Sequence, residues 1–563
     1  MLLEMSNLEV TVSTNEIAHT VRIPSIAVDQ GQTAILMGPS GSGKSVLLKT
    51  LSSVFTHTEV DVKGEVTVNE KNGKSIRLCD GVNMSETVDR PVVFYVFQDP
   101  RSYLHPRLTL REYGTLLEHR LSTVQNVGEL FEDSIEKSNL RHRWEVPAGY
   151  LSGGEAQRLM FAIMNVLRPR LVLADEPLSA QDRVHHAQLR GMLNDYVANS
   201  ENEAAMILVT HEIRDIQQSF ELDTKPVFYA LEKQSEQSWQ CSQVIDSESV
   251  QQLARAYLGD DGNSDVDATM PETIIDYFRA GKALYSPKLE EDLTNQVDGE
   301  SILSTQGLTF RWVKGRKENP LFSGINLEHR SDSNLGVMGL SGVGKSTLAE
   351  VLLGLTHGWE GKINWFNSRQ TTEDRLRQRV QYVFQDCERA MAWEVGNLEQ
   401  TILLPFRTKL SDTSTSFQDT FNKVLGTLNL LEHTEKNVQH LSGGQLRRAY
   451  LARALLVLLS DRKSDESVLL ALDEATVGLD LVAQYQLLHM LHQYTTDQYQ
   501  NMSLMVISHD PVVLRYLCNK IAVLFNDNSA SEGAKVVELL EGTQIGQGPF
   551  RHEHTRLLMG GLH

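Results

Sequence analysis

The stretch "GPSGSGKS" at residues 38–45 decides the fold of this chain. It matches the pattern G-x-x-x-x-G-K-[ST] and directly follows an apolar segment, "TAILM", at 33–37. A loop of this kind binds phosphates, because its glycines let backbone N–H groups turn inward and the helix that follows presents its positive end. The pattern returns as "GLSGVGKS" at 339–346, again after an apolar segment. Two matches in this context predict two phosphate-binding loops.

The two loops belong to two copies of one domain. Lys44 and Lys345 hold the same place in each loop and lie 345 − 44 = 301 positions apart. Such a period is too long for a solenoid and indicates a duplication. Four other blocks recur in the same order: "YVFQDP" at 95–100 and "YVFQDC" at 382–387, "LSGGEAQR" at 151–158 and "LSGGQLRR" at 441–448, "LVLADEPLSAQD" at 171–182 and "LLALDEATVGLD" at 469–480, and "LVTHE" at 208–212 and "VISHD" at 506–510.

A shift in composition separates the two copies. Residues 231–300 contain 15 acidic and 5 basic residues, and the stretch at 259–272 is typical of an exposed connector. We therefore place a first domain at 1–240, an acidic linker at 241–299 and a second domain at 300–563.

Each copy reads as a strand, a glycine loop and a helix, followed by short apolar strands separated by helical stretches. This pattern predicts an α/β fold with a mainly parallel sheet core in each copy. Residues 101–150 and 388–440 are rich in Leu, Glu and Arg at helical spacing. We expect a helical subdomain there, just before each "LSGG" block.

The bulk composition excludes several classes of protein. The 563 residues carry a formal net charge of −20, which opposes nucleic-acid binding by the chain as a whole. The four cysteines form no C-x-x-C pair, which indicates free thiols in a reducing compartment. The N-terminus does not resemble a signal peptide, and no apolar stretch approaches the ~18–20 residues that span a bilayer. We expect a cytoplasmic protein that reaches a membrane only through a partner.

Paired carboxylates follow one apolar strand in each copy. They are Asp175 and Glu176 in the first copy, and Asp473 and Glu474 in the second. The first acid can hold Mg²⁺, and the second can orient an attacking water or accept its proton. Successive strand residues point to opposite faces, which would separate the two roles. The alternative is a strand that merely ends in solvated acids, but its recurrence beside both phosphate loops argues against it.

Two further polar residues follow short apolar strands in both copies. Gln98 and Gln385 carry neutral amides, which bind Mg²⁺ or water less tightly than a carboxylate and suit a sensor. His211 and His509 could hydrogen-bond a γ-phosphate and steady the water. A lone histidine is more often structural, but the matched positions favour a functional role.

These motifs resemble the ATP-binding cassette (ABC) family, and the resemblance covers nearly all of both copies. It implies an ATPase with two tandem P-loop domains that bind ATP and Mg²⁺. Gln98 and Gln385 take the place of the family's Q-loop residues, and His211 and His509 that of its switch histidines. With Glu176 and Glu474 these form the implied catalytic set, and Asp182 and Asp480 match the D-loop aspartates.

The resemblance also implies the ligand contacts. The lysine of each loop would reach the β- and γ-phosphates. The implied nucleotide contacts are Gly38, Pro39, Ser40, Gly41, Ser42, Gly43, Lys44 and Ser45 in the first copy, and Gly339, Leu340, Ser341, Gly342, Val343, Gly344, Lys345, Ser346 and Thr347 in the second. The implied Mg²⁺ contacts are Ser45, Gln98, Asp175, Ser346, Gln385 and Asp473.

The block "LSGG" corresponds to the signature motif of the family. Ser152 and Glu155 have the spacing of a capping box, and Ser442 and Gln445 repeat it. The helix start after each serine offers bare N–H groups to an anion. In the family this helix start meets the ATP held by the other cassette. The resemblance therefore implies that the Lys44 loop shares its ATP with Ser442, Gly443 and Gly444, and the Lys345 loop with Ser152, Gly153 and Gly154.

One departure concerns the adenine. The family usually stacks an aromatic residue on the base near the start of the fold. The second copy offers Trp312 there, whereas the first copy has Val12. We expect weaker adenine packing in the first site, by roughly 1–3 kcal/mol for one lost stack.

Three classes of cassette protein compete. A DNA-repair or chromosome ATPase would need long coiled-coil or zinc insertions, which the sequence lacks. A soluble translation factor of the ABC-F type would need a long charged helical linker, whereas this linker is acidic and rich in Gly and Asp. A transport motor is favoured, because 95–113 and 550–558 resemble the Q-loop region and C-terminus of peptide and nickel importer ATPases. The second copy departs from that pattern, since Cys387 follows its Q-loop aspartate where the subfamily has proline.

The resemblance thus implies the ATP-hydrolysing subunit of a peptide/nickel-type importer, with the ABC-F factor as the alternative. The implied partners are two transmembrane permease subunits, identical or different, and an extracytoplasmic substrate-binding protein. The two cassettes would pair within one chain at the cytoplasmic face of the inner (plasma) membrane, as a peripheral protein. No nucleic acid is expected as a partner.

Overall fold

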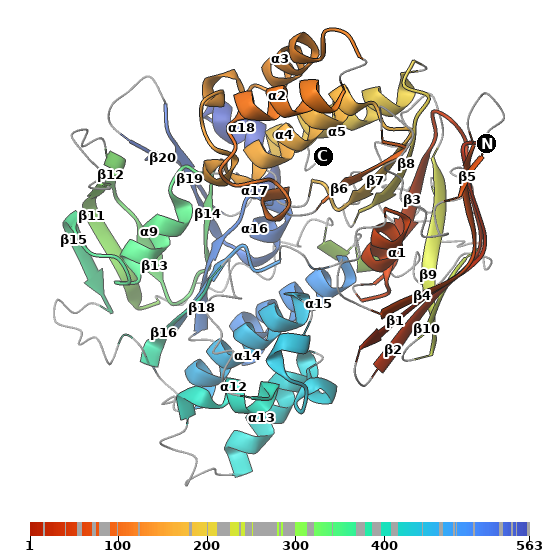
Figure 1. Ribbon diagram of the computed structural model, residues 1–563. Helices are drawn as coiled ribbons and strands as arrows, with labels where there is room; N and C mark the ends of the chain where they lie inside the picture. The colour runs from red at the N-terminus through yellow and green to blue at the C-terminus, as the bar shows by residue number, and fades with distance from the viewer. Residues whose placement is uncertain are drawn as a thin grey trace. The chain divides into compact units, whose positions relative to one another are not determined.

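The structure is a computed structural model of the whole chain, shown as a ribbon in Figure 1. Its description covers all residues except 15–16, 40, 53–58, 70–74, 78–90, 98–99, 122–123, 179–182, 200, 211–225, 236–237, 243–249, 251–278, 281–282, 285–298, 312–319, 341, 367–375, 377, 385–395, 407–414, 429, 442, 461–465, 477–478, 480, 499–501, 528–532, 542–543, 548 and 560–563.

The chain forms two compact units, one made mainly of residues 1–283 and the other mainly of 284–563. Each unit combines a parallel sheet with helices, so the predicted tandem α/β fold is confirmed. The linker proposed at 241–299 lies almost entirely outside the described residues. The limits of the two domains and of the linker therefore stay a prediction.

The first unit is built on one sheet with the strand order β5-β4-β1-β2-β10-β9-β3-β8-β7-β6. The strands from β9 to β6 pair in parallel and form the predicted core. The strands from β5 to β2 pair antiparallel, an extension that the sequence analysis did not anticipate. The strands are β1 (Leu3–Thr14), β2 (Ile17–Val28), β3 (Thr33–Met37), β4 (Glu59–Asn69), β5 (Ser75–Arg77), β6 (Val93–Val96), β7 (Leu171–Asp175), β8 (Ala205–Val209), β9 (Val227–Ser235) and β10 (Ser238–Cys241).

The second unit repeats the parallel core in the order β16-β17-β18-β14-β19, with β20 antiparallel at its edge. A separate antiparallel sheet places β12, β13 and β15 against β11. The strands are β11 (Ser301–Arg311), β12 (Pro320–Ile325), β13 (Glu328–Arg330), β14 (Leu335–Met338), β15 (Trp359–Trp365), β16 (Val380–Val383), β17 (Val468–Asp473), β18 (Met502–Ile507), β19 (Lys520–Phe525) and β20 (Lys535–Glu541).

Helices cover these sheets and build the predicted helical subdomains. In the first unit α2, α3 and α4 pack around an apolar cluster that includes Phe131 and Leu159, and α12, α13 and α14 take the same place in the second. None of the helices within the described ranges is both long and apolar enough to span a membrane. The helices are α1 (Lys44–Leu51), α2 (Leu110–Arg120), α3 (Val127–Lys137), α4 (Gly153–Leu167), α5 (Arg183–Ala198), α9 (Lys345–Leu352), α12 (Leu398–Ile402), α13 (Thr415–Thr427), α14 (Gly443–Ser460), α15 (Leu481–Gln493), α16 (Pro511–Leu517), α17 (Gln544–Gln547) and α18 (Glu553–Met559).

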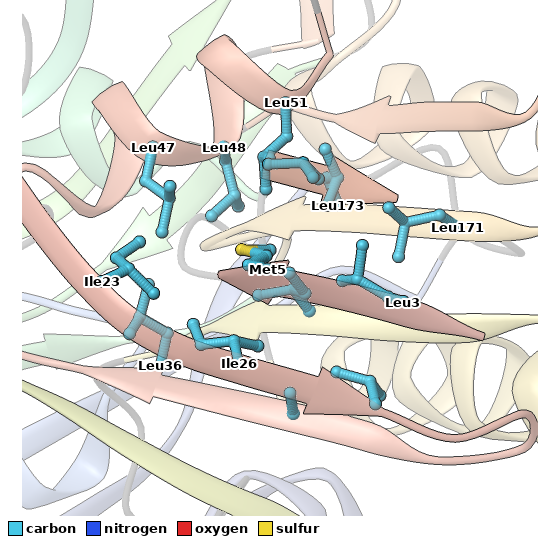
Figure 2. Packing of buried hydrophobic residues seen from close by; sticks show 14 of the residues in the cluster. Leu3, Met5, Ile23, Ile26, Leu36, Leu47, Leu48, Leu51, Leu171 and Leu173 are labelled. Atoms are coloured by element: carbon cyan, nitrogen blue, oxygen red, sulfur yellow. The ribbon is translucent and has the colours of Figure 1, made fainter. Parts of the chain in front are cut away.

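The core of the first unit holds the first phosphate loop in place. Leu47, Leu48 and Leu51 of α1 point into the same apolar cluster as Leu36 of β3 and Leu173 of β7 (Figure 2). Full burial of each leucine stabilises the packing by about 1.5–3 kcal/mol. Because α1 is anchored on the sheet in this way, the loop between β3 and α1 is held at both ends.

Candidate functional site

In both units a glycine loop joins a buried strand to a short helix, β3 to α1 and β14 to α9. Gly43 and Gly344 cap the two helices with φ of 93° and 103°, in the left-handed region that favours glycine. A Cβ on Gly43 would lie 2.3 Å from Cγ2 of Val21, and one on Gly344 would lie 3.0 Å from Cγ of Leu321. The glycines therefore allow the loop to turn closely against the neighbouring strand.

The loop lysines lie over their own loops. Lys44 Nζ donates to the carbonyl oxygens of Gly38 and Pro39, at 2.6 and 2.9 Å. Lys345 Nζ makes the matching bonds in the second unit, at 2.9 and 3.1 Å. The two lysines are only 5% and 8% exposed. A buried ammonium group beside the start of a helix is suited to bind an anionic phosphate.

A buried tyrosine holds the first acid of each pair. Tyr95 of β6 donates its hydroxyl to Oδ2 of Asp175 on β7, at 2.7 Å. Tyr382 of β16 donates to Oδ2 of Asp473 on β17, at 2.8 Å. Burial raises the pKa of each tyrosine, and the negative charge of its aspartate raises it further. The tyrosines therefore stay protonated and act as donors.

Burial also affects the acid itself in the second unit. It raises the pKa of Asp473, and the nearby Ser346 and Tyr382 hydroxyls offset this only in part. Oδ1 of Asp473 is buried and has no hydrogen-bond partner among the described residues. The carboxylate is thus fixed through one oxygen while the other is available to a ligand.

The second acid of each pair lies in a turn, not on the strand as the sequence analysis assumed. β7 ends at Asp175 and β17 at Asp473, so Glu176 and Glu474 follow the strands, with φ of 45° and 49°. The backbone N–H of each glutamate donates to the last residue of the neighbouring strand β8 or β18, at 3.0 and 2.9 Å. A left-handed glutamate costs on the order of 1–3 kcal/mol, and such strain concentrates at functional sites. The turn, rather than strand alternation, sets the direction of this acid.

In the second unit the glutamate contacts the predicted histidine. Oε1 of Glu474 accepts from the backbone N–H of His509 at 3.0 Å and lies 2.8 Å from Nδ1 of the same residue. The hydroxyl of Ser508 donates to Oε2 at 3.3 Å. Burial raises the pKa of Glu474, but the charge and hydrogen bonds of His509 outweigh it and lower that pKa. Burial lowers the pKa of His509, while Glu474 raises it to about 9. The two residues form an ion pair near neutral pH.

The signature segment of the first unit starts a helix with the predicted capping box. Ser152 Oγ accepts from the N–H of Glu155 at 3.3 Å, and Oε2 of Glu155 accepts from the N–H of Ser152 at 2.8 Å. A Cβ built on Gly153 would meet nothing within 4 Å in the described structure. The packing around this helix start therefore does not require a glycine. A glycine at this position is consistent with a helix start that leaves space for a ligand.

The two signature segments differ in charge. In the first unit Oε1 of Glu155 accepts from Nε of Arg143 at 2.7 Å. In the second unit Gln445 Nε2 lies 2.9 Å from Nε2 of His433. This matching pair is neutral, because the amide carries no charge and burial lowers the pKa of His433. Burial raises the pKa of Glu155, but hydrogen bonds from Ser152 and Arg143 lower it overall.

The donors of the second unit fit Mg²⁺. Ser346 and Asp473 offer a hydroxyl and a carboxylate oxygen, and hard oxygen ligands are the ones that Mg²⁺ prefers. The partnerless Oδ1 of Asp473 supports this fit. In the described ranges no group of three or more His, Cys, Asp or Glu residues could hold a metal, so a site of zinc type is not seen there.

Several predicted site residues lie outside the described residues, so their placement stays a prediction. They are Ser40, Gln98, Asp182, His211, Trp312, Ser341, Gln385, Ser442 and Asp480.

Comparisons with known proteins decide the family. The family model described as "ABC transporter" matches residues 21–179 and 322–477, which together make up more than half of the chain. The chain belongs to the ABC transporter family. Each unit is therefore an ABC cassette that binds and hydrolyses ATP, and the predicted ATPase activity is confirmed.

Two relatives resemble the chain over nearly its whole length. The glutathione import ATP-binding protein GsiA of Salmonella choleraesuis is 26% identical, covering 96% of this chain and 86% of the relative. The uncharacterized ABC transporter ATP-binding protein YejF of Escherichia coli is 26% identical, covering 94% and 95%. The predicted likeness to oligopeptide-type importer ATPases is confirmed.

Solved tandem-cassette structures share the fold. The RNase-L inhibitor gives a TM-score of 0.57 at 17% identity, covering 95% of this chain and 90% of that one. The archaeal ribosome recycling factor aABCE1, in complex with the stalk protein aP1, gives 0.58 at 17% identity, covering 92% and 88%. At this identity the likeness concerns the fold alone.

Some residues of the cassettes' candidate sites were not predicted from the sequence. Tyr95 and Tyr382 stand in the repeated "YVFQD" block, so their recurrence was a signal that could have drawn attention to them. Arg143 carried no such signal, because the matching residue of the second cassette is His433. Arg447, which donates from Nη1 to the carbonyl oxygen of Glu474 at 2.9 Å, also lacks a counterpart, since Gln157 takes its place in the first cassette.

Proposed function

We propose that this chain is the ATP-hydrolysing subunit of an ABC importer for peptide-like substrates. The observation that carries the proposal is the likeness to an import ATP-binding protein along 96% of the chain, which includes both cassettes. The proposed partners are two permease subunits, identical or different, and an extracytoplasmic substrate-binding protein. The proposed location is the cytoplasmic face of the plasma membrane.

The proposed chemistry follows from the second cassette. Lys345 and the loop N–H groups would bind the phosphates, and His509 would orient Glu474 toward the attacking water. Ser346, Gln385 and Asp473 would hold Mg²⁺, which would neutralise charge on the phosphates when bound. The first cassette carries the matching residues, with Ser45, Gln98 and Asp175 as proposed Mg²⁺ contacts and Glu176 and His211 as the proposed catalytic pair.

The proposed working cycle is a clamp. Each signature segment would cover the ATP held by the other cassette, so two ATP would close the pair and hydrolysis would release it. Closure would move permease helices docked beside the helical subdomains. Tyr103 supports such a docking place, because its ring is 49% exposed and stacks on Phe97, one residue before Gln98 (ring centroids 3.4 Å apart).

Purification of the tagged chain from detergent-solubilised membranes tests this function. We expect two multi-span subunits to co-purify, and Tyr103→Asp to weaken their capture. Leu557→Asp is the control, because Leu557 is 57% exposed but lies in the C-terminal helix α18. Co-sedimentation with ribosomes, without any membrane partner, would overturn the proposal in favour of a translation factor. The net charge of −20 argues against that alternative, because ribosomal RNA is polyanionic.

A further inference from the structure

The tyrosine of the "YVFQD" block makes the same contact in both cassettes. Tyr95 and Tyr382 lie on strands that pair in parallel with the strand carrying the acid. Their hydroxyls donate to Oδ2 of Asp175 and of Asp473, across 80 and 91 positions of sequence. Both contacts are buried. A buried feature that recurs with the same atoms in two diverged copies calls for an explanation beyond packing.

Packing alone does not require the hydroxyl. Each ring lies in an apolar cluster and contacts the phenylalanine two residues later, with ring centroids 4.4 Å apart for Phe97 and 4.5 Å for Phe384. A phenylalanine would fill this space equally well. A buried hydroxyl needs a hydrogen-bond partner, and here the partner is the carboxylate proposed to contact Mg²⁺.

The bond also restricts how the carboxylate can bind. With Oδ2 engaged by Tyr382, the aspartate is fixed in rotation and presents Oδ1, which has no partner in the described structure. Groups that orient a metal ligand in this manner affect metal affinity although they do not contact the metal. In the sequence Gln385, another proposed Mg²⁺ contact, follows Tyr382 by three positions.

We propose that Tyr95 and Tyr382 are positioning residues for Mg²⁺ at the two ATP sites, holding Asp175 and Asp473 so that one carboxylate oxygen faces the ion. The inference rests on the proposed Mg²⁺ contacts but not on the proposed transport role. Its consequence is that loss of the hydroxyl weakens binding of the metal–nucleotide complex without weakening binding of the metal-free nucleotide.

The test compares full-length variants that keep one working site. Tyr382→Phe is made in a Lys44→Ala background and Tyr95→Phe in a Lys345→Ala background. The affinity for a non-hydrolysable ATP analogue is measured once in EDTA and once in Mg²⁺. Mn²⁺ binding to the complex of protein and analogue is followed by electron paramagnetic resonance. We expect roughly 10- to 100-fold weaker Mn²⁺ binding and unchanged affinity in EDTA.

Two controls separate the outcomes. Tyr229→Phe removes another buried hydroxyl, which bonds the backbone N–H and carbonyl oxygen of Ala27 rather than a carboxylate, and should leave Mn²⁺ binding unchanged. Asp473→Asn should abolish Mn²⁺ binding and the difference in analogue affinity between Mg²⁺ and EDTA. If Asp473→Asn does so while Tyr382→Phe binds Mn²⁺ like the parent, the positioning role is overturned and the site stands. If a Tyr→Phe variant lost affinity for the analogue equally in EDTA and in Mg²⁺, the tyrosine would have only a structural role, and the proposed positioning role would be overturned. An unaffected Asp473→Asn would overturn the proposed Mg²⁺ site together with this inference.

Discussion

Nδ1 of His509 lies 2.8 Å from Oε1 of Glu474, and beside the phosphate loop of the second cassette the glutamate is buried and the histidine half-buried. The pair joins the ends of two parallel strands, β17 and β18, which the fold brings side by side. The bond fixes the direction of the carboxylate, and a carboxylate fixed in this way needs little reorganisation when it activates a water.

Replacing the glutamates should slow hydrolysis without preventing binding. Glu474→Gln keeps the size of the side chain but removes the proton acceptor, so we expect phosphate release to fall by roughly 10²–10⁴-fold. Glu176→Gln should do the same in the first cassette. The measurement is steady-state phosphate release, with nucleotide binding as the control that must stay intact. A variant with wild-type turnover would show that its site does not use that glutamate.

Each signature segment should act on the nucleotide of the other cassette. Ser152→Ala should weaken nucleotide binding at the Lys345 site by roughly tenfold, the effect of one lost hydrogen bond to a charged group. Nucleotide binding at the Lys44 site should stay unchanged. Photo-crosslinking with an azido-ATP, followed by peptide mapping, reports the two sites separately. Thr109→Ala is the matched control, because Thr109 also caps a helix through a capping box but lies outside the signature. Loss at the Lys44 site instead would contradict the clamp.

The two sites should bind adenine unequally. Val12 of β1 cannot stack on a base as Trp312 can, so we expect the first site to bind ATP more weakly by roughly 1–3 kcal/mol. Full-length Lys345→Ala and Lys44→Ala variants isolate the first and second sites for titration. Val12→Trp should reduce the difference in ATP affinity between the two sites. Equal affinities in the two single-site variants would remove the basis of this expectation.

A buried histidine should make the second cassette sensitive to acid. His329 Nε2 lies 3.0 Å from Ser503 Oγ, its Nδ1 has no partner within the described structure, and burial lowers its pKa to about 4. Between that value and the ordinary 6.5 the unfolded chain binds a proton that the folded one does not. Neutral His329 therefore costs the folded state no stability above pH 6.5. As pH falls toward 4, the free energy of unfolding decreases by up to about 3 kcal/mol.

Denaturant unfolding at pH 7, 5 and 4 measures this effect. The first cassette supplies the control, because Val28 and Ala205 hold the matching positions in its strands. His329→Val combined with Ser503→Ala copies that apolar pair and should flatten the pH dependence of the second cassette. An equally steep acid loss in the double variant would assign the sensitivity to other groups.

The Arg143–Glu155 pair should stabilise the first signature helix. Arg143 is 40% exposed, so solvent screens the pair, and we expect Arg143→Ala to cost no more than about 1 kcal/mol. Glu155→Gln reproduces the residue of the second cassette, and a double-mutant cycle with Arg143→Ala isolates the pair. A coupling energy of zero would mean that the contact between Arg143 and Glu155 does not stabilise the first cassette.

Much of the fold was readable because its motifs are local. The phosphate loops need glycine at set positions of a strand–loop–helix unit, and Gly43 and Gly344 have the left-handed backbone that this requires. The duplication was visible because five blocks recur in order. The antiparallel strands β1, β2 and β4 were not foreseen, because their alternation carries no motif and their pairing depends on distant partners.

The sequence by itself determined two cassettes, their phosphate loops and the acids beside them, since these depend on residues a few positions apart. Only the tertiary structure decided what holds those acids. Tyr382 meets Asp473 because parallel pairing of β16 with β17 sets their register, and Glu474 meets His509 because β17 and β18 end at the same edge. The turn at Glu474 and the different partners of Glu155 and Gln445 likewise follow from packing. Hydrogen bonds depend on distance in space, and only the folded sheet brings together groups that the chain places 35 to 91 residues apart.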